Sequence, residues 1–258
     1  MSGLGWPDAR SPRDAALPIV LVPSLGTTST LFDGLAREIA LRLPDASIIL
    51  ADLPGHGSGP LASTVSVEAL ADDLAAHVAA APRRALVIGV SMGGAIALEA
   101  ARRHPGRIAG VVQVNSGAQF GSAEGWQGLI DTVTKGGTAR LTPSSETGWF
   151  AEGFRGSAIA RELLDEVAGI DDDSYIACCR ALAGYDGAHD LERLDVPALL
   201  IGTADDGATP AFGMRVLSAQ LPRGAYAELP AGGHLSVAEH PGWIAERIAV
   251  WAGEEVDA

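Results

Sequence analysis

Cysteine and basic residues are scarce in this sequence, and each shortage excludes a class of protein. The 258 residues include two cysteines, Cys178 and Cys179, which are adjacent and cannot easily pair with each other or share a metal ion. We therefore expect reduced thiols and a cytoplasmic protein. Lysine and arginine total 18 against 32 aspartates and glutamates, which gives a formal net charge of -14. Such a charge repels nucleic acid and anionic membrane surfaces, so a small molecule is the expected partner.

Long apolar runs are also missing. No stretch reaches the roughly 18 apolar residues that a membrane-spanning helix needs. Residues 1–16 carry charges and prolines instead of the apolar core of a signal peptide, which predicts a protein that is neither exported nor inserted in a membrane. With 47% hydrophobic residues, the chain can bury a full core, and its length favours one large domain. The sequence leaves the oligomeric state open, a homo-oligomer included.

The hydrophobic pattern is typical of an α/β fold. Short apolar runs alternate with stretches of helical period, which predicts a mostly parallel central sheet with helices on both faces. Strands are predicted at residues 17–22, 47–51, 85–90, 107–115, 197–202 and 225–229. Helices are predicted at residues 29–41, 65–80, 210–221 and 241–251, with another directly after residue 91.

The β pattern disappears between residue 117 and about residue 191. This segment is helical in period, rich in aromatic residues and interrupted by glycines. We expect it to form a helical lid over the ends of the strands. The chain is then a single domain with a core at about 17–116 and 192–254 and a lid at about 117–191.

Ser91 occupies the centre of residues 89–93, Gly-Val-Ser-Met-Gly, between a predicted strand and a predicted helix. This arrangement is typical of a nucleophile elbow, a sharp turn that exposes the serine hydroxyl at the end of a sheet. It also directs a helix N-terminus at the reacting group, where backbone N–H groups can stabilise an oxyanion. The alternative is an ordinary glycine-rich turn, which the flanking strand and helix disfavour.

A serine hydroxyl needs a base to take its proton and a carboxylate to orient that base. His234 lies in a glycine-rich turn after the last predicted strand, and Asp205 and Asp206 follow the strand before it. We predict His234 as general base and Asp205 as the orienting acid, with Asp206 as the alternative. The order Ser, Asp, His is that of α/β-hydrolases.

Several stretches together make the chain resemble α/β-hydrolases, and within them the 3-oxoadipate enol-lactonases of aromatic degradation. The matching stretches are residues 24–28 (Ser-Leu-Gly-Thr-Thr), 52–57 (Asp-Leu-Pro-Gly-His-Gly), 91–95, 149–150 (Trp-Phe), 175–182 and 233–236. His56 belongs to the second of these, and we interpret it as a structural residue that makes a hydrogen bond. The 16 residues before the first predicted strand show no strand pattern, so the N-terminal β-hairpin of most relatives is not predicted.

The resemblance implies an α/β-hydrolase fold and a role for each matching residue. On this resemblance, Ser91 is expected to attack the carbonyl of an enol-lactone, His234 to act as base and then acid, and Asp205 to orient the imidazole. The backbone N–H groups of Leu25 and Met92 are expected to form the oxyanion hole. The product is 3-oxoadipate, in the β-ketoadipate pathway, and neither a metal nor an organic cofactor is implied.

An enol-lactone of this kind carries a carboxylate, which an acidic protein must hold with a local cation. A guanidinium binds a carboxylate through two hydrogen bonds, so Arg140, Arg155 and Arg180 of the predicted lid are candidates. Trp149 is a candidate for the pocket wall. Residues 117–143 match the enol-lactonases least, and two alternative functions therefore remain open. One is a general carboxylesterase or a perhydrolase, and the other is a non-catalytic ligand-binding protein on the same fold.

Overall fold

The strands of the computed structural model, which describes residues 3–7 and 17–256, form one parallel sheet. The strand order is β2-β1-β3-β4-β5-β6, and every neighbouring pair is parallel. The strands are β1 (Leu17–Val22), β2 (Ala46–Leu50), β3 (Ala85–Val90), β4 (Ile108–Val114), β5 (Ala198–Thr203) and β6 (Gly224–Leu229). Each predicted strand is present, with its ends shifted by at most one residue.

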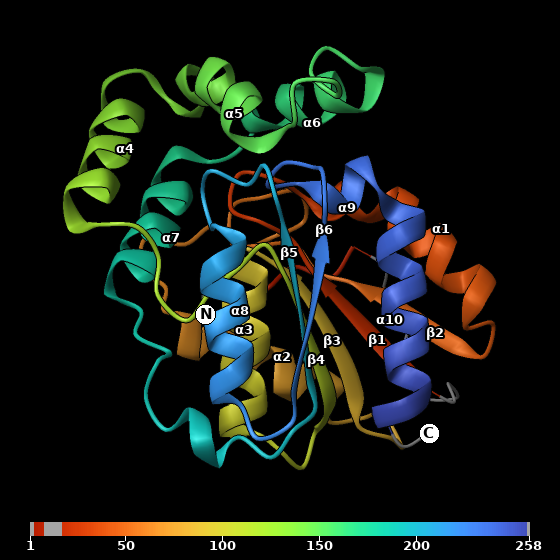
Figure 1. Cartoon of the computed structure of the whole chain (residues 1–258). Helices are drawn as coiled ribbons and strands as arrows, with labels where there is room; N and C mark the ends of the chain where they lie inside the picture. Colours follow the sequence, from red (N-terminus) through yellow and green to blue (C-terminus); the bar gives the residue numbers. More distant parts are fainter. Residues whose placement is uncertain (1–2, 8–16, 257–258) are drawn as a thin grey trace.

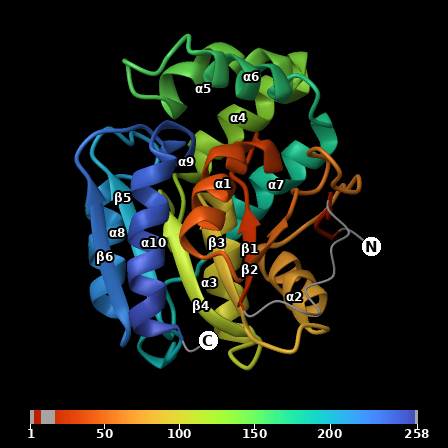
Figure 2. The same ribbon diagram turned by 90° about the vertical axis from the view of Figure 1, so that its right-hand side faces the viewer.

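Helices cover both faces of this sheet (Figures 1 and 2). They are α1 (Asp33–Arg42), α2 (Val67–Val78), α3 (Met92–Arg103), α8 (Ala211–Gln220), α9 (Ser236–Glu239) and α10 (Pro241–Glu255). The predicted helix over residues 29–41 is a 3₁₀ turn (Ser29–Phe32) followed by α1. Along β1, Val20 packs in the cluster that contains α2, α3 and α8, whereas Leu21 packs in the cluster that contains α1 and α10. Burial on both faces explains why the strands are continuous apolar runs in the sequence.

A helical insertion joins β4 to β5 and lies above the carboxyl ends of the strands (Figure 1). Its helices are α4 (Ala123–Gly136), α5 (Thr142–Trp149), α6 (Ala158–Val167) and α7 (Asp172–Gly184). Ser122, Ser157 and Asp171 cap the N-termini of α4, α6 and α7 through their side-chain oxygens, which fixes where these helices begin. Helices therefore occupy the segment as predicted, and its action as a lid stays a prediction.

Hydrogen bonds attach the insertion to loops of the core. The Thr28 hydroxyl, after β1, donates to the Glu166 carboxylate of α6 over 2.9 Å. The Asp171 amide, at the start of α7, donates to the Gly55 carbonyl oxygen over 3.1 Å. The loop after β1 also lines the site described below, through Ser24 and Leu25.

The N-terminal segment, residues 3–7, packs against the core, and the Trp6 ring stacks on that of His77. Gly5 and Asp52 exchange two backbone hydrogen bonds, of 2.8 and 2.9 Å, in an isolated antiparallel bridge. Residues 3–7 contain no strand, and residues 8–16, where a hairpin strand was not predicted, lie outside the described part of the chain. Over residues 3–7 and 17–256, no helix is both long and apolar enough to span a membrane.

Candidate active site

Ser91 lies at the sharp turn between β3 and α3, at the carboxyl end of the sheet. Its backbone is in an unusual region, with φ 53° and ψ -115°, and its side chain is largely buried. The turn needs small neighbours, because a Cβ atom on Gly93 would lie 2.0 Å from the carbonyl oxygen of Val22. A Cβ atom on Gly89 would lie 2.1 Å from the backbone of Gly93. The local geometry is that of the elbow that residues 89–93 predicted.

His234 and Asp206 form a buried pair beside this turn. The His234 Nδ1 atom lies 3.0 Å from Oδ2 of Asp206, so Nδ1 donates and Nε2 is left free to accept. Thr209 donates to the same Oδ2 atom from its hydroxyl over 2.7 Å. Burial alone would raise the pKa of Asp206. The hydrogen bond and charge of His234, together with the Thr209 bonds, outweigh burial and hold that pKa below its usual value. The carboxylate therefore stays ionised.

The prediction that Asp205 is the partner of His234 is wrong. Asp205 is exposed, and its Oδ2 atom accepts the N–H of Gly232 over 3.1 Å. The chain turns directly after β5, so that these two neighbouring carboxylates take different directions. A local signal could have separated them, because Asp206 also accepts the amides of Ala208 and Thr209, two and three residues further on. An aspartate that closes such a turn is held in place by its own backbone.

Two buried polar residues, neither of them among the predicted site residues, hold the loop that carries His234. The Asn115 side-chain amide donates to the carbonyl oxygens of Gly233 and His234 over 2.9 Å each. The Thr203 hydroxyl donates to the Gly233 oxygen over 2.9 Å. Asn115 directly follows β4 and has φ 46°, and Thr203 ends β5. A polar residue at the end of a buried apolar strand was the available signal.

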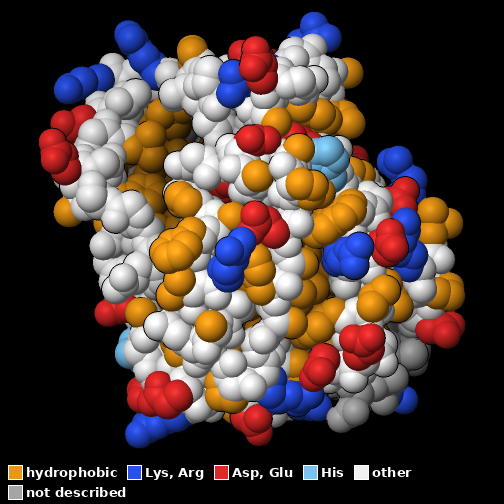
Figure 3. Space-filling view, viewed as in Figure 1, with side chains coloured by type: hydrophobic (Ala, Val, Ile, Leu, Met, Phe, Trp, Pro, Cys, Tyr) orange, Lys and Arg blue, Asp and Glu red, His pale blue; other side chains and the backbone are white. Residues whose placement is uncertain are grey.

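Ser91 and His234 line the same cavity, which has a volume of about 280 Å³. The insertion supplies most of its walls, and Figure 3 shows an apolar hollow between α4 and the rest of the molecule. No Asp, Glu, Lys or Arg is among the described residues that line the cavity. The remaining walls come from Leu25, Phe120, Trp126, Leu129, Leu141, Trp149, Tyr175, Leu182 and Thr209, with several serines and glycines.

The loop after β1 brings Leu25 to this cavity, and Met92 begins α3 next to Ser91. His56 holds the loop, since its Nε2 atom accepts the Gly26 amide over 3.1 Å and its Nδ1 atom donates to the Pro54 carbonyl oxygen over 2.8 Å. Complete burial lowers the pKa of His56 to about 4, although the Pro54 bond and nearby carboxylates oppose this shift. The imidazole is therefore neutral near pH 7, and the prediction of a structural hydrogen bond is confirmed.

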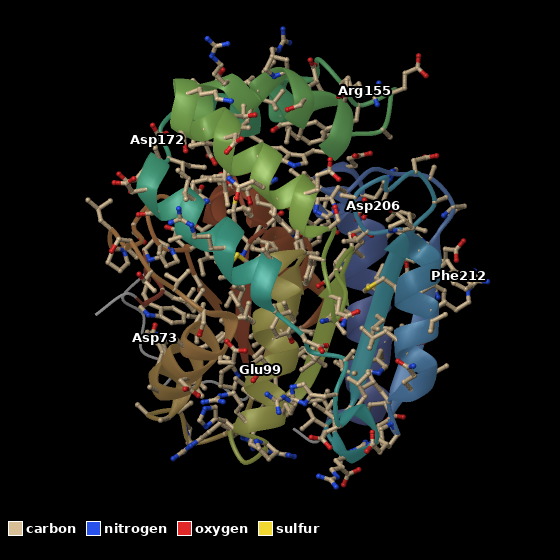
Figure 4. All side chains as sticks on the ribbon, turned by 90° about the vertical axis from the view of Figure 1, so that its left-hand side faces the viewer. Asp73, Glu99, Arg155, Asp172, Asp206 and Phe212 are labelled. Carbon is tan, nitrogen blue, oxygen red and sulfur yellow. The ribbon has the colours of Figure 1, made fainter. Side chains whose placement is uncertain are left out.

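Of the four residues expected to bind substrate, the structure brings only Trp149 to the cavity. Arg140, Arg155 and Arg180 are exposed and do not line it, which contradicts the expectation that one of them holds a substrate carboxylate there. The Arg155 guanidinium donates to the carbonyl oxygens of Phe150 and Thr147 over 3.0 and 3.1 Å. Figure 4 shows Arg155 on the insertion, above Asp206. Arg140 and Arg180 lie on helices and Arg155 lies in a turn after α5, and the sequence pattern did not reveal that all three are exposed.

Comparisons with known proteins agree with this arrangement. A 3-oxoadipate enol-lactonase of Acinetobacter baylyi is 28% identical over 229 residues, which cover 86% of this chain and 84% of the relative. A pimeloyl-[acyl-carrier protein] methyl ester esterase of Chromobacterium violaceum is also 28% identical, over 232 residues that cover 86% of this chain and 89% of the relative. The resemblance to enol-lactonases is thus confirmed, and methyl ester esterases are about equally similar.

Solved structures share the whole architecture. The enol-lactonase of Burkholderia xenovorans superimposes with a TM-score of 0.86 and 25% identity, covering 97% of this chain and 96% of that chain. A thermophilic esterase of Thermogutta terrifontis gives a TM-score of 0.87 at 22% identity, covering 98% and 94%. A family model described as "Alpha/beta hydrolase family" matches residues 19–247, from β1 into α10. The chain belongs to the alpha/beta hydrolase family.

Proposed function

We propose that this hydrolase cleaves carboxylic esters, lactones included, through an acyl-enzyme on Ser91. One observation carries the proposal: the cavity that contains Ser91 also contains His234, whose far nitrogen is paired with the buried carboxylate of Asp206. A hydroxyl, an imidazole and an ionised carboxylate in that order are the parts that serine acyl transfer requires.

The reaction proceeds in two halves. His234 Nε2 takes the proton of the Ser91 hydroxyl as its oxygen attacks the ester carbonyl, and Asp206 stabilises the resulting imidazolium. The tetrahedral oxyanion lies against the amides of Leu25 and Met92. It collapses with loss of the alkoxide or enolate, which takes the proton from His234. Water then attacks the acyl-enzyme, giving its proton to His234, and the collapse of the second oxyanion returns that proton to Ser91 as the acid leaves.

The first substrate to test is 3-oxoadipate enol-lactone, because a relative with this activity in its name aligns over most of the chain. The expelled enolate would relax to a ketone and give 3-oxoadipate. A role in aromatic degradation and a cytoplasmic location belong to this same proposal.

The walls of the cavity favour a second class of substrate, uncharged esters. An anionic substrate would bring its carboxylate into a cavity whose described walls offer hydroxyls and aromatic rings but no cation. A carboxylate that leaves water without a partner loses binding free energy. We therefore expect a neutral lactone or short-chain ester to be turned over faster than a carboxylate-bearing analogue of the same size.

Active-site labelling and a substrate comparison test the proposal. A fluorophosphonate should label the wild-type protein and spare Ser91→Ala, whereas Ser63→Ala, in an exposed loop, should label normally. Hydrolysis of the enol-lactone, p-nitrophenyl butyrate and p-nitrophenyl hydrogen glutarate is then measured side by side. Failure of labelling would favour a non-catalytic binding protein. Labelling together with turnover of the esters but not of the lactone would favour a general carboxylesterase. Assays with added hydrogen peroxide test perhydrolysis.

A further inference from the structure

One carboxylate links the insertion to the loop of His234. Oε1 of Glu239, the last residue of α9, accepts the amide of Ala151 over 3.1 Å and the amide of Gly233 over 3.1 Å. Ala151 lies in the insertion just after α5, and Gly233 immediately precedes His234. Both ribbon views show α9 directly beneath the α5–α6 part of the insertion (Figures 1 and 2).

The backbones of the two segments also touch on both sides of His234. The Leu235 amide donates to the Trp149 carbonyl oxygen over 3.0 Å. A Cβ atom on Gly233 would lie 2.5 Å from that same oxygen and 2.7 Å from the Ala151 nitrogen. Residues 149–151 therefore run against the loop 233–235 at a distance that leaves no room for a side chain on Gly233.

The side chain of Trp149 reaches the loop after β1, residues 24–28, which carries Leu25, the proposed oxyanion donor; we call it the oxyanion loop. The indole ring of Trp149 lies over Gly26, where a Cβ atom would come within 2.8 Å of the ring. Gly26 follows Leu25, and both Leu25 and Trp149 line the cavity. A stretch of three residues in the insertion thus contacts the two core loops that hold the proposed base and the proposed oxyanion donor.

We propose that Glu239 is a positioning residue that docks residues 149–151 on the loop of His234, so that the imidazole and the oxyanion loop are aligned together only while this part of the insertion is docked. The kinetic consequence rests on the proposed function, whereas the docking itself does not. Burial raises the pKa of Glu239, and the bonds from Ala151 and Gly233 counteract that rise, as expected for a carboxylate that serves these two amides.

The test compares Glu239→Ala with Glu239→Gln, because glutamine keeps an oxygen that can accept both amides and alanine keeps none. Glu152→Ala is the matched control, since Glu152 is an exposed acid that lines the same surface hollow as Glu239. Amide hydrogen exchange of peptides covering residues 149–151 and 232–235 reports docking directly. The value of kcat and the rate of fluorophosphonate labelling report alignment.

Glu239→Ala should accelerate exchange in both peptides and lower kcat on the order of 10- to 100-fold, because a small displacement of a reacting group costs about this much. KM should change by less than kcat does. Glu239→Gln should stay within about threefold of wild type in each measurement, a difference worth less than 1 kcal/mol. Glu152→Ala should behave as wild type.

Two outcomes overturn the proposal. The first is wild-type exchange of the peptide covering residues 149–151 in Glu239→Ala, including the case in which only the peptide covering 232–235 exchanges faster. The second is an equal loss of kcat in Glu239→Gln and Glu239→Ala. Should Glu239→Ala not fold, Gly233→Ala tests whether docking of residues 149–151 sets kcat, because its methyl group pushes the two backbones apart, and Glu239→Gln against wild type still tests the carboxylate. The exchange result stands even if Ser91→Ala retains full activity, so failure of the docking proposal and of the proposed function are distinguishable.

Discussion

The loops at the strand ends and the insertion above them contribute different parts of the site. The loops provide the groups that move protons and charge, and buried hydrogen bonds from strand-end residues such as Asn115 and Thr203 fix them. The insertion provides walls that are largely apolar and lack a charged side chain among the described cavity residues. Residues 149–151 of the insertion contact both the loop of His234 and Gly26, the neighbour of Leu25.

This division indicates where reaction and selection are expected to reside. A change in a strand-end loop should alter the chemical step for every substrate. A change in the walls of the insertion should alter the ranking of substrates while the reaction persists. Kinetics of variants in each region should separate these two effects.

The largest effect is expected at the strand-end loops. Ser91→Ala and His234→Ala should each lower kcat on the order of 10⁴- to 10⁶-fold with a smaller change in KM, because each removes a member of a unit that acts together. Steady-state kinetics on the best ester substrate measures this. Ser63→Ala, in an exposed loop, serves as the control. More than a tenth of wild-type kcat in Ser91→Ala would contradict the proposed nucleophile.

The two neighbouring aspartates give the next effect. Asp206→Asn should lower kcat on the order of 10²- to 10⁴-fold, because an amide no longer stabilises the imidazolium and does not enforce the Nδ1–H tautomer. Asp205→Asn should stay within a few-fold of wild type, since Asp205 is exposed and bonds only the loop amide of Gly232. A larger loss in Asp205→Asn than in Asp206→Asn would refute the assignment.

His56 predicts a pH dependence of stability. Its pKa is about 4 in the folded protein against an ordinary value of 6.5, so below pH 6.5 the unfolded chain binds a proton that the folded chain refuses. The stabilisation is complete above pH 6.5 and about 3 kcal/mol of it is lost by pH 4. Urea unfolding of wild type and His56→Gln at pH 7, 5 and 4 measures this. Between pH 7 and pH 4, the free energy of unfolding of His56→Gln should fall by about 3 kcal/mol less than that of wild type. Equal falls in the two proteins would disprove this account.

The smallest effect concerns the walls of the insertion. Leu129→Arg places a cation on the cavity wall, and a charged hydrogen bond should raise kcat/KM for p-nitrophenyl hydrogen glutarate about tenfold relative to p-nitrophenyl butyrate. Leu129→Met, similar in size and uncharged, is the control. An unchanged ratio would mean that Leu129 does not face the bound acyl group.

Much of the core was predictable, because parallel strands buried on both faces are apolar runs and the helices between them keep a helical period. Residues 85–90 and 198–203 are examples of such strands. Ser91 was predictable for a related reason, since close contact of strand and helix demands glycine at positions 89 and 93. The pattern Gly-x-Ser-x-Gly reflects a packing constraint that is local in sequence.

The choice between Asp205 and Asp206 was not predictable from the strand pattern. Both follow β5 directly. The direction of Asp206 depends on its local bond with Thr209 and on His234, which comes from a distant part of the chain. The expected binding role of the arginines failed as well. For Arg180, helical period gives the faces of α7, and only the packing of the helix decides which face meets the cavity.

The order of residues was enough to specify the sheet, the elbow at Ser91 and the approximate positions of its partners, because each depends on short-range sterics and on alternation between apolar and polar residues. Three features required the folded chain: which carboxylate meets His234, which walls the cavity has and how residues 149–151 bridge two core loops. These features depend on contacts between segments far apart in the chain, and their distances are set when the insertion packs on the ends of the strands.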